Sequence, residues 1–215
     1  MEPTILERTN SSIVKFLESP LPRKLFSKAE RIPVDDLVGE INPLTIPIKI
    51  KPLHPFQVLA ALVDEDELRP ALTGIYHCVD KQCMVVTNGH YMFVHPAAVE
   101  KAALIRPSNG AVIDDMFPDY LSVIPFYERC AYLTDLSGLA SRLNGLVRAN
   151  KFLTGIIPAR ISYQERSVFL DPSMFLKLIT SFIQLGATKL RIDLPTGSDT
   201  VRAIVFRDAR NLHSM

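Results

Sequence analysis

The chain has 215 residues, of which 47% are hydrophobic and 22% are charged, and its net charge is +1 at pH 7. These values are typical of one globular domain or two small ones, and they indicate no strongly basic surface for nucleic acid. No apolar run reaches the ~18–20 residues that span a membrane, and no apolar signal segment opens the sequence. With only 3 cysteines, the sequence predicts a reduced, cytoplasmic protein without a disulfide framework.

Residues 1–43 are expected to form an arm outside the main domain. The stretch 20–31 carries Arg23 and Lys24 among apolar residues that include Phe26. One interpretation is a solvated arm that packs Phe26 against the domain. The other is a basic arm that contacts phosphates. The sequence leaves both interpretations open.

Helices and hairpins alternate over the rest of the chain. Apolar runs and apolar–polar alternation predict the strands, and capping residues with helical apolar spacing predict the helices. In the segment 44–125 we expect a strand over Leu44–Ile50, a helix beginning at His54-Pro55, strands over Ala71–Val79 and Cys83–Val94, and turns at Asp80–Gln82 and Asn88-Gly89. In the segment 126–215 we expect strands over Arg129–Leu133, Phe152–Ser162, Val168–Leu170, Lys189–Leu194 and Val201–Phe206, and helices over Leu136–Ala149 and from Asp171-Pro172 to Gly186.

This order of elements predicts the α+β class, with helices on one face of antiparallel sheets. The sequence contains no Gly-x-Ser-x-Gly elbow, no Gly-rich phosphate loop and no His-Glu-x-x-His helix. We therefore expect a protein that is not an enzyme and that uses no cofactor. A hydrolase or nuclease on an unfamiliar fold is the weakest of the remaining classes.

Two groups of residues invite a metal interpretation, and neither pattern favours it. The acidic run Asp64–Glu67 is typical of solvated residues after a helix, since consecutive carboxylates cannot all point at one ion. Cys78 and Cys83 accompany several histidines, but a single Cys-x4-Cys pair lacks the spacing of a structural zinc site. We expect no metal; the histidines concerned are His77, His90 and His95.

Three strings carry a family resemblance: Arg69–Tyr76 (RPALTGIY), Thr87–Met92 (TNGHYM) and Phe117–Pro125 (FPDYLSVIP). Read in that order, they resemble the middle of a bacterial replicative sliding clamp, the beta subunit of DNA polymerase III. Further on, the segments 150–156 and 167–194 are similar to parts of a following clamp domain. The resemblance implies a DNA clamp-like fold built from strand–helix–strands repeats.

A complete clamp protomer in this family has three domains, and the chain is far shorter than that. We expect one clamp-like domain over 44–215, with half-repeats at about 44–125 and 126–215. The reason is that each half has a sheet and helices whose apolar faces become buried only when the other half packs against them. Two degenerate domains are the alternative.

In the family, the T-x-G-H-x-L strand end, the P-D-Y-x-x-V connector and an apolar C-terminal tail form a groove for partner peptides. The resemblance therefore implies a groove lined by Thr87, Gly89, His90, Tyr91, Met92, Pro118, Ser122 and Val123. Each of these residues also has a purely structural interpretation, such as a turn glycine or a pinned connector. The chain departs from the family at Asn88, Tyr91 and Ser122, and it lacks the apolar tail.

The leading hypothesis is a clamp-like accessory protein of DNA replication or repair that acts through protein–protein contacts. Its implied partners are replication or repair proteins with a linear peptide motif, double-stranded DNA held weakly and without sequence preference, and further copies of the chain. The alternative is an interaction or regulatory module that has the clamp fold and does not bind DNA. The candidate DNA contacts are Arg23, Lys24, Arg142, Arg148 and Lys151.

Overall fold

The computed structural model describes residues 30–31, 45–63, 69–124, 129–152, 156–163, 166–194 and 204–211. Within these residues the helices α3 (Pro55–Leu62), α4 (Leu136–Asn150) and α5 (Pro172–Gln184) accompany sheets in which all strand pairs but the parallel pair of Glu30–Arg31 with Arg129–Leu133 are antiparallel. This confirms the predicted α+β class. Most of the expected arm, including Arg23 and Lys24, and the acidic run Asp64–Glu67 lie outside the described residues.

The first half of the chain, up to residue 124, is a four-stranded antiparallel sheet with one helix. The strands follow the order β4-β3-β2-β5, and α3 covers the sheet through Leu59 and Leu62, which pack with Ile75, Val86 and Phe93. Both leucines are fully buried, so this helix contributes a full apolar face to the first core. The strands are β2 (Ile75–Cys78), β3 (Cys83–Thr87), β4 (Met92–Pro96) and β5 (Ala103–Ile105).

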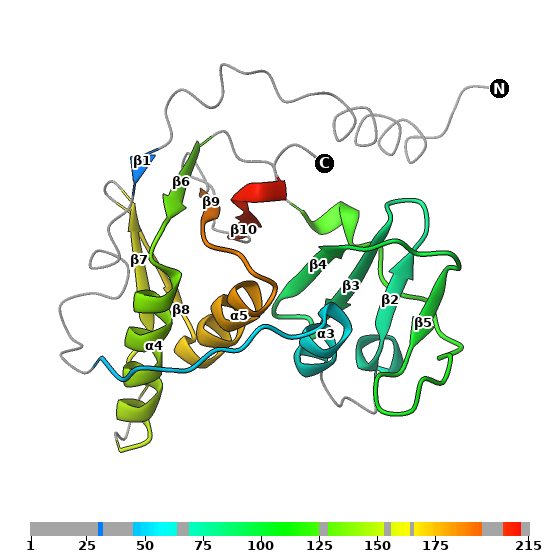
Figure 1. Ribbon diagram of the computed structural model, residues 1–215, viewed down its shortest axis with the longest axis horizontal. Helices are drawn as coiled ribbons and strands as arrows, with labels where there is room; N and C mark the ends of the chain where they lie inside the picture. Colours follow the sequence, from blue (N-terminus) through cyan, green and yellow to red (C-terminus); the bar gives the residue numbers. More distant parts are fainter. Residues whose placement is uncertain are drawn as a thin grey trace.

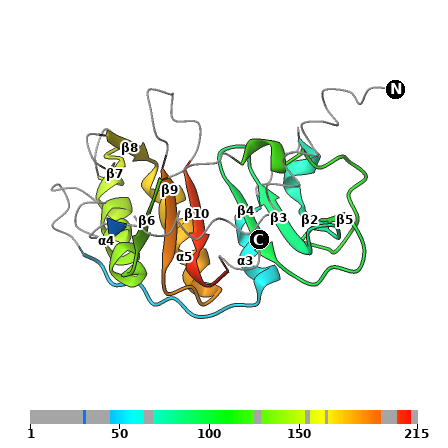
Figure 2. The ribbon, with the colours of Figure 1, turned by 90° about the horizontal axis from the view of Figure 1, so that it is seen from above.

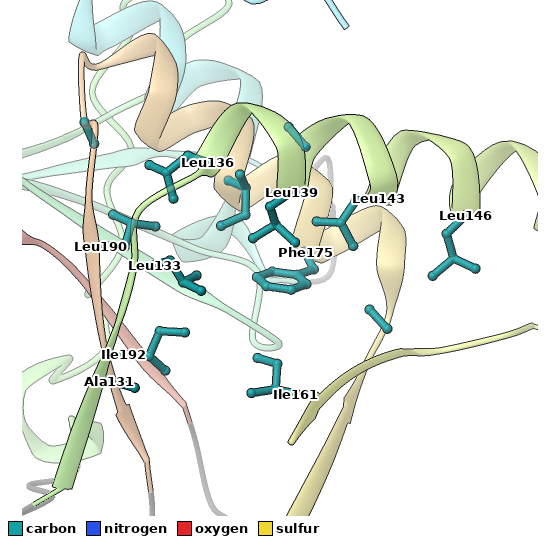
Figure 3. Close-up of a cluster of buried hydrophobic side chains, with 14 residues drawn as sticks. Ala131, Leu133, Leu136, Leu139, Leu143, Leu146, Ile161, Phe175, Leu190 and Ile192 are labelled. Atoms are coloured by element: carbon teal, nitrogen blue, oxygen red, sulfur yellow. The ribbon is translucent and has the colours of Figure 1, made fainter. Parts of the chain in front are cut away.

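The second half contains the longer helices and the larger core. The helices α4 and α5 pack side by side against the sheets, and Leu139, Leu143 and Phe175 lie at the centre of the core that they bury (Figure 3). One sheet has the order β1-β6-β9-β10, and β7 and β8 form a separate hairpin (Figure 1). The strands are β1 (Glu30–Arg31), β6 (Arg129–Leu133), β7 (Ala159–Tyr163), β8 (Arg166–Leu170), β9 (Leu190–Leu194) and β10 (Val205–Asp208).

The helix boundaries follow local capping chemistry. Asp171 is the N-cap of α5, and its carboxylate accepts hydrogen bonds from the backbone N–H groups of Ser173 and Met174 at 2.8 and 2.9 Å. His54 caps α3 in the same way through Nδ1, with Pro55 at the first helical position. Gly186 ends α5 with φ +82°, a conformation that glycine adopts without a steric penalty. These starts and stops confirm the sequence predictions for α3 and α5.

The expected strand over Leu44–Ile50 is wrong over the residues that the structure describes. The segment Thr45–Leu53, called the strap below, is extended but joins no sheet, and it runs along α4 and α5 to reach α3 (Figures 1 and 2). The backbone N–H of Ile46 donates to the carbonyl of Ser141 at 3.1 Å, and the Asn144 side-chain amide donates to the carbonyl of Ile46 at 3.1 Å. The alternation of apolar and polar residues correctly predicts an extended chain with one apolar side. This segment, however, packs on a helix and does not pair with another strand.

Two features of the first half differ from the sequence prediction. The strand expected from Ala71 begins only at Ile75, because residues 70–73 form a 3-10 helix in which the Thr73 hydroxyl donates to the carbonyl of Pro70. The strand β5 was not predicted, and it pairs antiparallel with β2. A strand as short as Ala103–Ile105 carries too few residues for its alternation to be recognised in the sequence.

The two halves are joined by side-chain packing. The rings of Phe93 on β4 and Phe182 on α5 have their centroids 4.9 Å apart. Phe182 also packs against the core of the second half, so it contacts both clusters of buried residues. The backbone N–H of Leu53 donates to the carbonyl of Gln184 at 3.3 Å, which ties the end of the strap to the end of α5.

Candidate partner-binding surface

The end of β3 turns sharply through Asn88 and Gly89. The side-chain oxygen of Asn88 accepts hydrogen bonds from the backbone N–H groups of His90 and Tyr91 at 3.0 and 3.1 Å. Gly89 has φ +84°, and a Cβ at this position would lie 3.3 Å from an Arg69 guanidinium nitrogen. The turn therefore has a specific need for glycine, and Asn88 supplies its hydrogen bonds.

The connector 117–124 is pinned to the sheet by aromatic residues. Phe117 stacks on Tyr76 of β2, with ring centroids 4.9 Å apart, and Tyr120 meets the same ring edge-on at 6.5 Å. Tyr120 is 7% exposed and is the buried anchor of the segment. A single turn of 3-10 helix, Leu121–Val123, follows it and is closed by the Ser122 hydroxyl, which donates to the carbonyl of Asp119 at 2.7 Å.

Met92 and the connector contribute to one apolar cluster. Met92 packs against a group of buried residues, Cys78, Cys83, Val85 and Tyr120, and the connector residues Leu121 and Ile124 pack against the same group. In the β3–β4 ladder Met92 is paired with Thr87, whereas Tyr120 contacts Cys83 at the other end of β3. The strand end and the connector are thus linked through this cluster.

The predicted groove residues fall into two groups by exposure. His90, Pro118, Ser122 and Val123 are exposed, with Val123 at 64%, as is Gly89 in the turn. Thr87 and Met92 are half-buried, and the Thr87 hydroxyl donates to the carbonyl of Tyr91 at 2.7 Å. We call the exposed residues His90, Pro118, Ser122 and Val123, together with Met92, the connector surface.

Tyr91 lies apart from this surface and joins the two halves. Its side chain packs against the core beneath α3 together with Leu178 and Leu185 of the second half, and its hydroxyl donates to the carbonyl of Leu62. The Lys177 ammonium on α5 lies 5.8 Å from the centre of the Tyr91 ring. Two tyrosines hold the connector: Tyr120, for which the sequence offers the structural interpretation of a residue that pins the connector, and Tyr76, which the sequence does not single out. The aromatic character of Tyr76 is the only hint of its role, because contact between distant aromatic residues is not a sequence property.

The segment 45–63 and the helices α4 and α5 contain no carboxylate side chains. None of the 23 Asp and Glu residues of the chain lies within 45–63, α4 or α5. Lys49 and Lys51 alternate along the strap with Ile48 and Ile50, which pack against the core, so the two lysines are exposed. The other basic residues here are Arg148, Lys151 and Lys177, which are exposed, and Arg142, which is half-buried. We call this region the helical layer.

Other kinds of site find no support in the part of the chain that the structure describes. No group of three or more His, Cys, Asp or Glu side chains that could hold a metal ion occurs among those residues. Within the same ranges, every helix is too short or too polar to cross a membrane. The side chain of Cys130 lies outside the described set, and Cys78 and Cys83 are free thiols.

The second half of the chain repeats the order of a strand, a helix and further strands, as β6-α4-β7-β8 and β8-α5-β9-β10, and the first half packs one helix on an antiparallel sheet. Comparison with solved structures shows that the chain has the fold of bacterial beta sliding clamps. The C. crescentus beta sliding clamp matches with TM-score 0.51 and 15% identity over 74% of this chain and 60% of that one. The DNA polymerase III subunit beta from Borrelia burgdorferi matches with TM-score 0.52 and 17% identity over 81% of this chain and 62% of that one. The beta subunit from DNA polymerase of Streptococcus pyogenes matches with TM-score 0.51 and 12% identity over 80% of this chain and 65% of that one.

These similarities concern the fold of the chain. The chain spans roughly 60–65% of the length of these clamps, and identities of 12–17% mark a divergent sequence. No protein-family model matches the chain. No curated protein matches it either.

Proposed function

We propose that this protein is a clamp-like accessory protein of DNA replication or repair that acts by binding a short peptide of a partner protein at the connector surface. The observation that carries the proposal is that Met92, at the end of the Thr87–Met92 string, and the connector residues Tyr120, Leu121 and Ile124 belong to one apolar cluster. The same two strings form the peptide groove in the resembling family. The proposal assigns the protein no enzymatic activity and no cofactor.

The connector surface offers apolar side chains next to a few polar groups, as peptide-binding sites generally do. Val123 is 64% exposed, so burying it under a partner side chain removes apolar area from water. The Ser122 hydroxyl is already used within the connector, so specificity would rest on His90 and on backbone groups.

The helical layer supports a second, weaker contact with DNA. A polyanion approaching this side meets basic side chains and no carboxylate from the three segments that form it. Of the DNA contacts that the sequence suggested, Arg142, Arg148 and Lys151 belong to this layer, and Arg23 and Lys24 lie outside the described residues. We propose that such contacts are non-specific and that encirclement of DNA would require several copies of the chain.

A clamp-fold interaction module that does not bind DNA is the alternative function. The overall net charge of +1 favours it, because few basic residues are available for phosphate contacts. The two proposals share the connector surface and differ only at the helical layer.

A peptide titration tests the proposal. A labelled synthetic peptide with Leu and Phe near its end is titrated with the wild-type protein, with Val123→Ser and with the matched control Val112→Ser. Val112 is 69% exposed and lies outside the connector. We expect Val123→Ser to weaken binding by about 1 kcal/mol, roughly fivefold, and Val112→Ser to leave it unchanged. Equal effects of both variants, or no binding by the wild type, would refute the proposed site.

A light-scattering mass separates the two versions of the function. The mass is measured with and without a short DNA duplex at low salt. A rise in mass on adding DNA favours the DNA-associated version, and an unchanged mass favours the interaction module. The mass without DNA also gives the number of copies in the assembly.

A further inference from the structure

Two cysteines face each other at the closed end of the β2–β3 hairpin. Cys78 is the last residue of β2, Cys83 is the first residue of β3, and the two are direct partners in the antiparallel ladder. Directly opposed residues in such a ladder have Cα atoms about 4.5–5.5 Å apart. A disulfide bridges Cα atoms about 4.4–6.8 Å apart, so the backbone already has a spacing that permits the bond.

The turn between the cysteines is locked in place. The Gln82 side-chain amide donates to the carbonyls of Val79 and Val99 at 2.8 and 3.0 Å, and its oxygen accepts from the backbone N–H of Val99 at 3.1 Å. The backbone carbonyl of Gln82 accepts a further hydrogen bond from Ala97 at 2.8 Å. The hairpin end is therefore held on both sides, and the two thiols keep their mutual position.

The hydroxyl of Tyr120 lies against both thiols. Its oxygen is 3.5 Å from the Cys83 sulfur and 3.6 Å from the Cys78 sulfur. The three side chains are 4%, 7% and 7% exposed for Cys83, Cys78 and Tyr120, so solvent does not reach the thiols while Tyr120 is seated. Burial also raises the pKa of the Cys83 thiol, which keeps it protonated and unreactive in this state.

We propose that Cys78 and Cys83 form a redox-active pair that becomes oxidised to a disulfide when the connector lifts off the sheet. Opening is required because Tyr120 covers the thiols and belongs to the connector that Phe117 also pins. The pair therefore links the redox state to the position of the connector. Only the consequence for partner binding rests on the proposed function; formation of the bond does not.

The oxidation balances with a peroxide as the oxidant. The first thiolate attacks one oxygen of hydrogen peroxide, which breaks the O–O bond, leaves a sulfenic acid and releases water. The second thiolate attacks the sulfenic sulfur, forms the S–S bond and expels the hydroxyl as a second water. The two sulfurs lose two electrons and the peroxide gains them, and the two thiol protons leave in the water.

The disulfide changes what Tyr120 can contact. In the reduced pair the Tyr120 hydroxyl donates to the Cys78 sulfur, and the Cys83 thiol can donate to the tyrosine oxygen, whereas a disulfide offers no donor. After oxidation the buried hydroxyl of Tyr120 has weaker hydrogen-bond partners, so the state in which the connector is packed on the sheet becomes less favourable. Oxidation should therefore loosen the residues around Val123 that form the connector surface.

Peptide mapping of the wild-type protein detects the bond directly. The full chain is treated with hydrogen peroxide, the remaining thiols are alkylated and the protein is digested with trypsin without reduction. Cleavage after Lys81 separates Cys78 from Cys83, so the disulfide leaves two peptides joined and reduction releases them. We expect the joined peptides from the folded protein. Their absence after complete oxidation, or a bond from either residue to Cys130, would overturn the proposal.

Variants of the connector test whether opening controls the reaction. Phe117→Ala removes the stack on Tyr76 without changing the thiols. We expect it to speed disulfide formation about fivefold or more, which corresponds to a decrease of about 1 kcal/mol in the free energy that holds the connector on the sheet. Ile124→Val is a milder variant of the same segment, in case Phe117→Ala does not fold. The control Phe169→Ala alters a 62% exposed side chain of the other half and should leave the rate unchanged. Equal rates in all of these proteins would show that the connector does not guard the pair.

Hydrogen exchange then reads the effect of the bond on the connector. We expect the amides of residues 119–124 to exchange faster in the oxidised protein than in the reduced protein, with no change in β9. Unchanged exchange at 119–124 would overturn the coupling. Failure of peptide binding alone would overturn the proposed function and leave the disulfide result intact.

Discussion

The ring of Phe93, on β4, packs against the ring of Phe182, on α5, with their centroids 4.9 Å apart. The two residues belong to different halves of the chain, and Phe182 also reaches the core of the second half. This aromatic pair thus connects the helical layer with the first sheet, in addition to the contacts of Tyr91. On this basis we propose that residues 44–215 fold as one domain.

Replacing Phe182 by Ala should destabilise both halves together. The side chain is half-buried between two cores, so we expect a decrease of about 2–3 kcal/mol in the free energy of unfolding, below the value for a fully buried phenylalanine. Denaturant unfolding, followed by circular dichroism and by aromatic signals, checks the result. A single shifted transition supports one domain. The control Phe169→Ala should change stability by less than about 0.5 kcal/mol. Two separate transitions would indicate two domains.

Met92→Ala should reduce folding stability and peptide affinity to different degrees. Met92 is half-buried in the cluster that contains Tyr120, so removing it leaves a gap beneath the connector. We expect a decrease of about 1–2 kcal/mol in unfolding free energy, below the value for a fully buried methionine. Thermal melting and peptide titration on the same variant separate the two effects. A lowered melting temperature with unchanged affinity would mean that Met92 is purely structural.

Charge reversal on the strap should weaken DNA binding. The double variant Lys49→Glu, Lys51→Glu places carboxylates in a layer that has none. We expect a lower affinity for a DNA duplex and a shallower dependence on salt, with the log–log slope reduced by about 1 for each phosphate that the variant no longer neutralises. Titrations at several salt concentrations measure both. The control Lys101→Glu alters an exposed lysine outside the helical layer. Equal decreases in affinity for the two proteins would assign the effect to net charge alone.

His77 should make the domain less stable in mild acid. Its Nε2 is buried and has no hydrogen-bond partner among the described residues, and burial lowers its pKa below the ordinary value of 6.5. The unfolded chain therefore binds a proton at a higher pH than the folded protein does, so stability falls as the pH drops below about 6.5 and continues to fall until the folded-state pKa is reached. His95 contributes in the same direction, since burial also lowers its pKa. Melting temperatures between pH 7.5 and 5 check this, and His77→Gln should show a smaller decrease than the wild type. An equal decrease in both proteins would assign the effect to other groups.

The chemistry of neighbouring residues was enough to predict the helices and most of the hairpins from the sequence. Asp171 followed by Pro172 predicted the start of α5, since a carboxylate cap and a proline without an N–H act on the nearest turn of backbone. Asn88 and Gly89 predicted the turn at the end of β3 for a similar reason. The strings that contain these residues resemble sliding clamps, and this resemblance predicts a clamp-like fold. The similarity to solved clamp structures confirms that fold.

Only the tertiary structure decided which distant surfaces meet. The alternation in 45–50 predicts an extended chain with one apolar side. Such a side can be buried against a helix or against a neighbouring strand equally well. In the structure the partner is α4, and the Asn144 side chain donates a hydrogen bond to the carbonyl of Ile46. The place of Tyr91 in its string predicts a residue of the partner surface, whereas its ring packs between the halves. Tyr120 is recognisable in the sequence as a connector residue, but its contact with Cys78 and Cys83 could not be foreseen. Capping and turn formation act between neighbours along the chain and are written in the sequence, whereas packing depends on which elements the folded chain brings together.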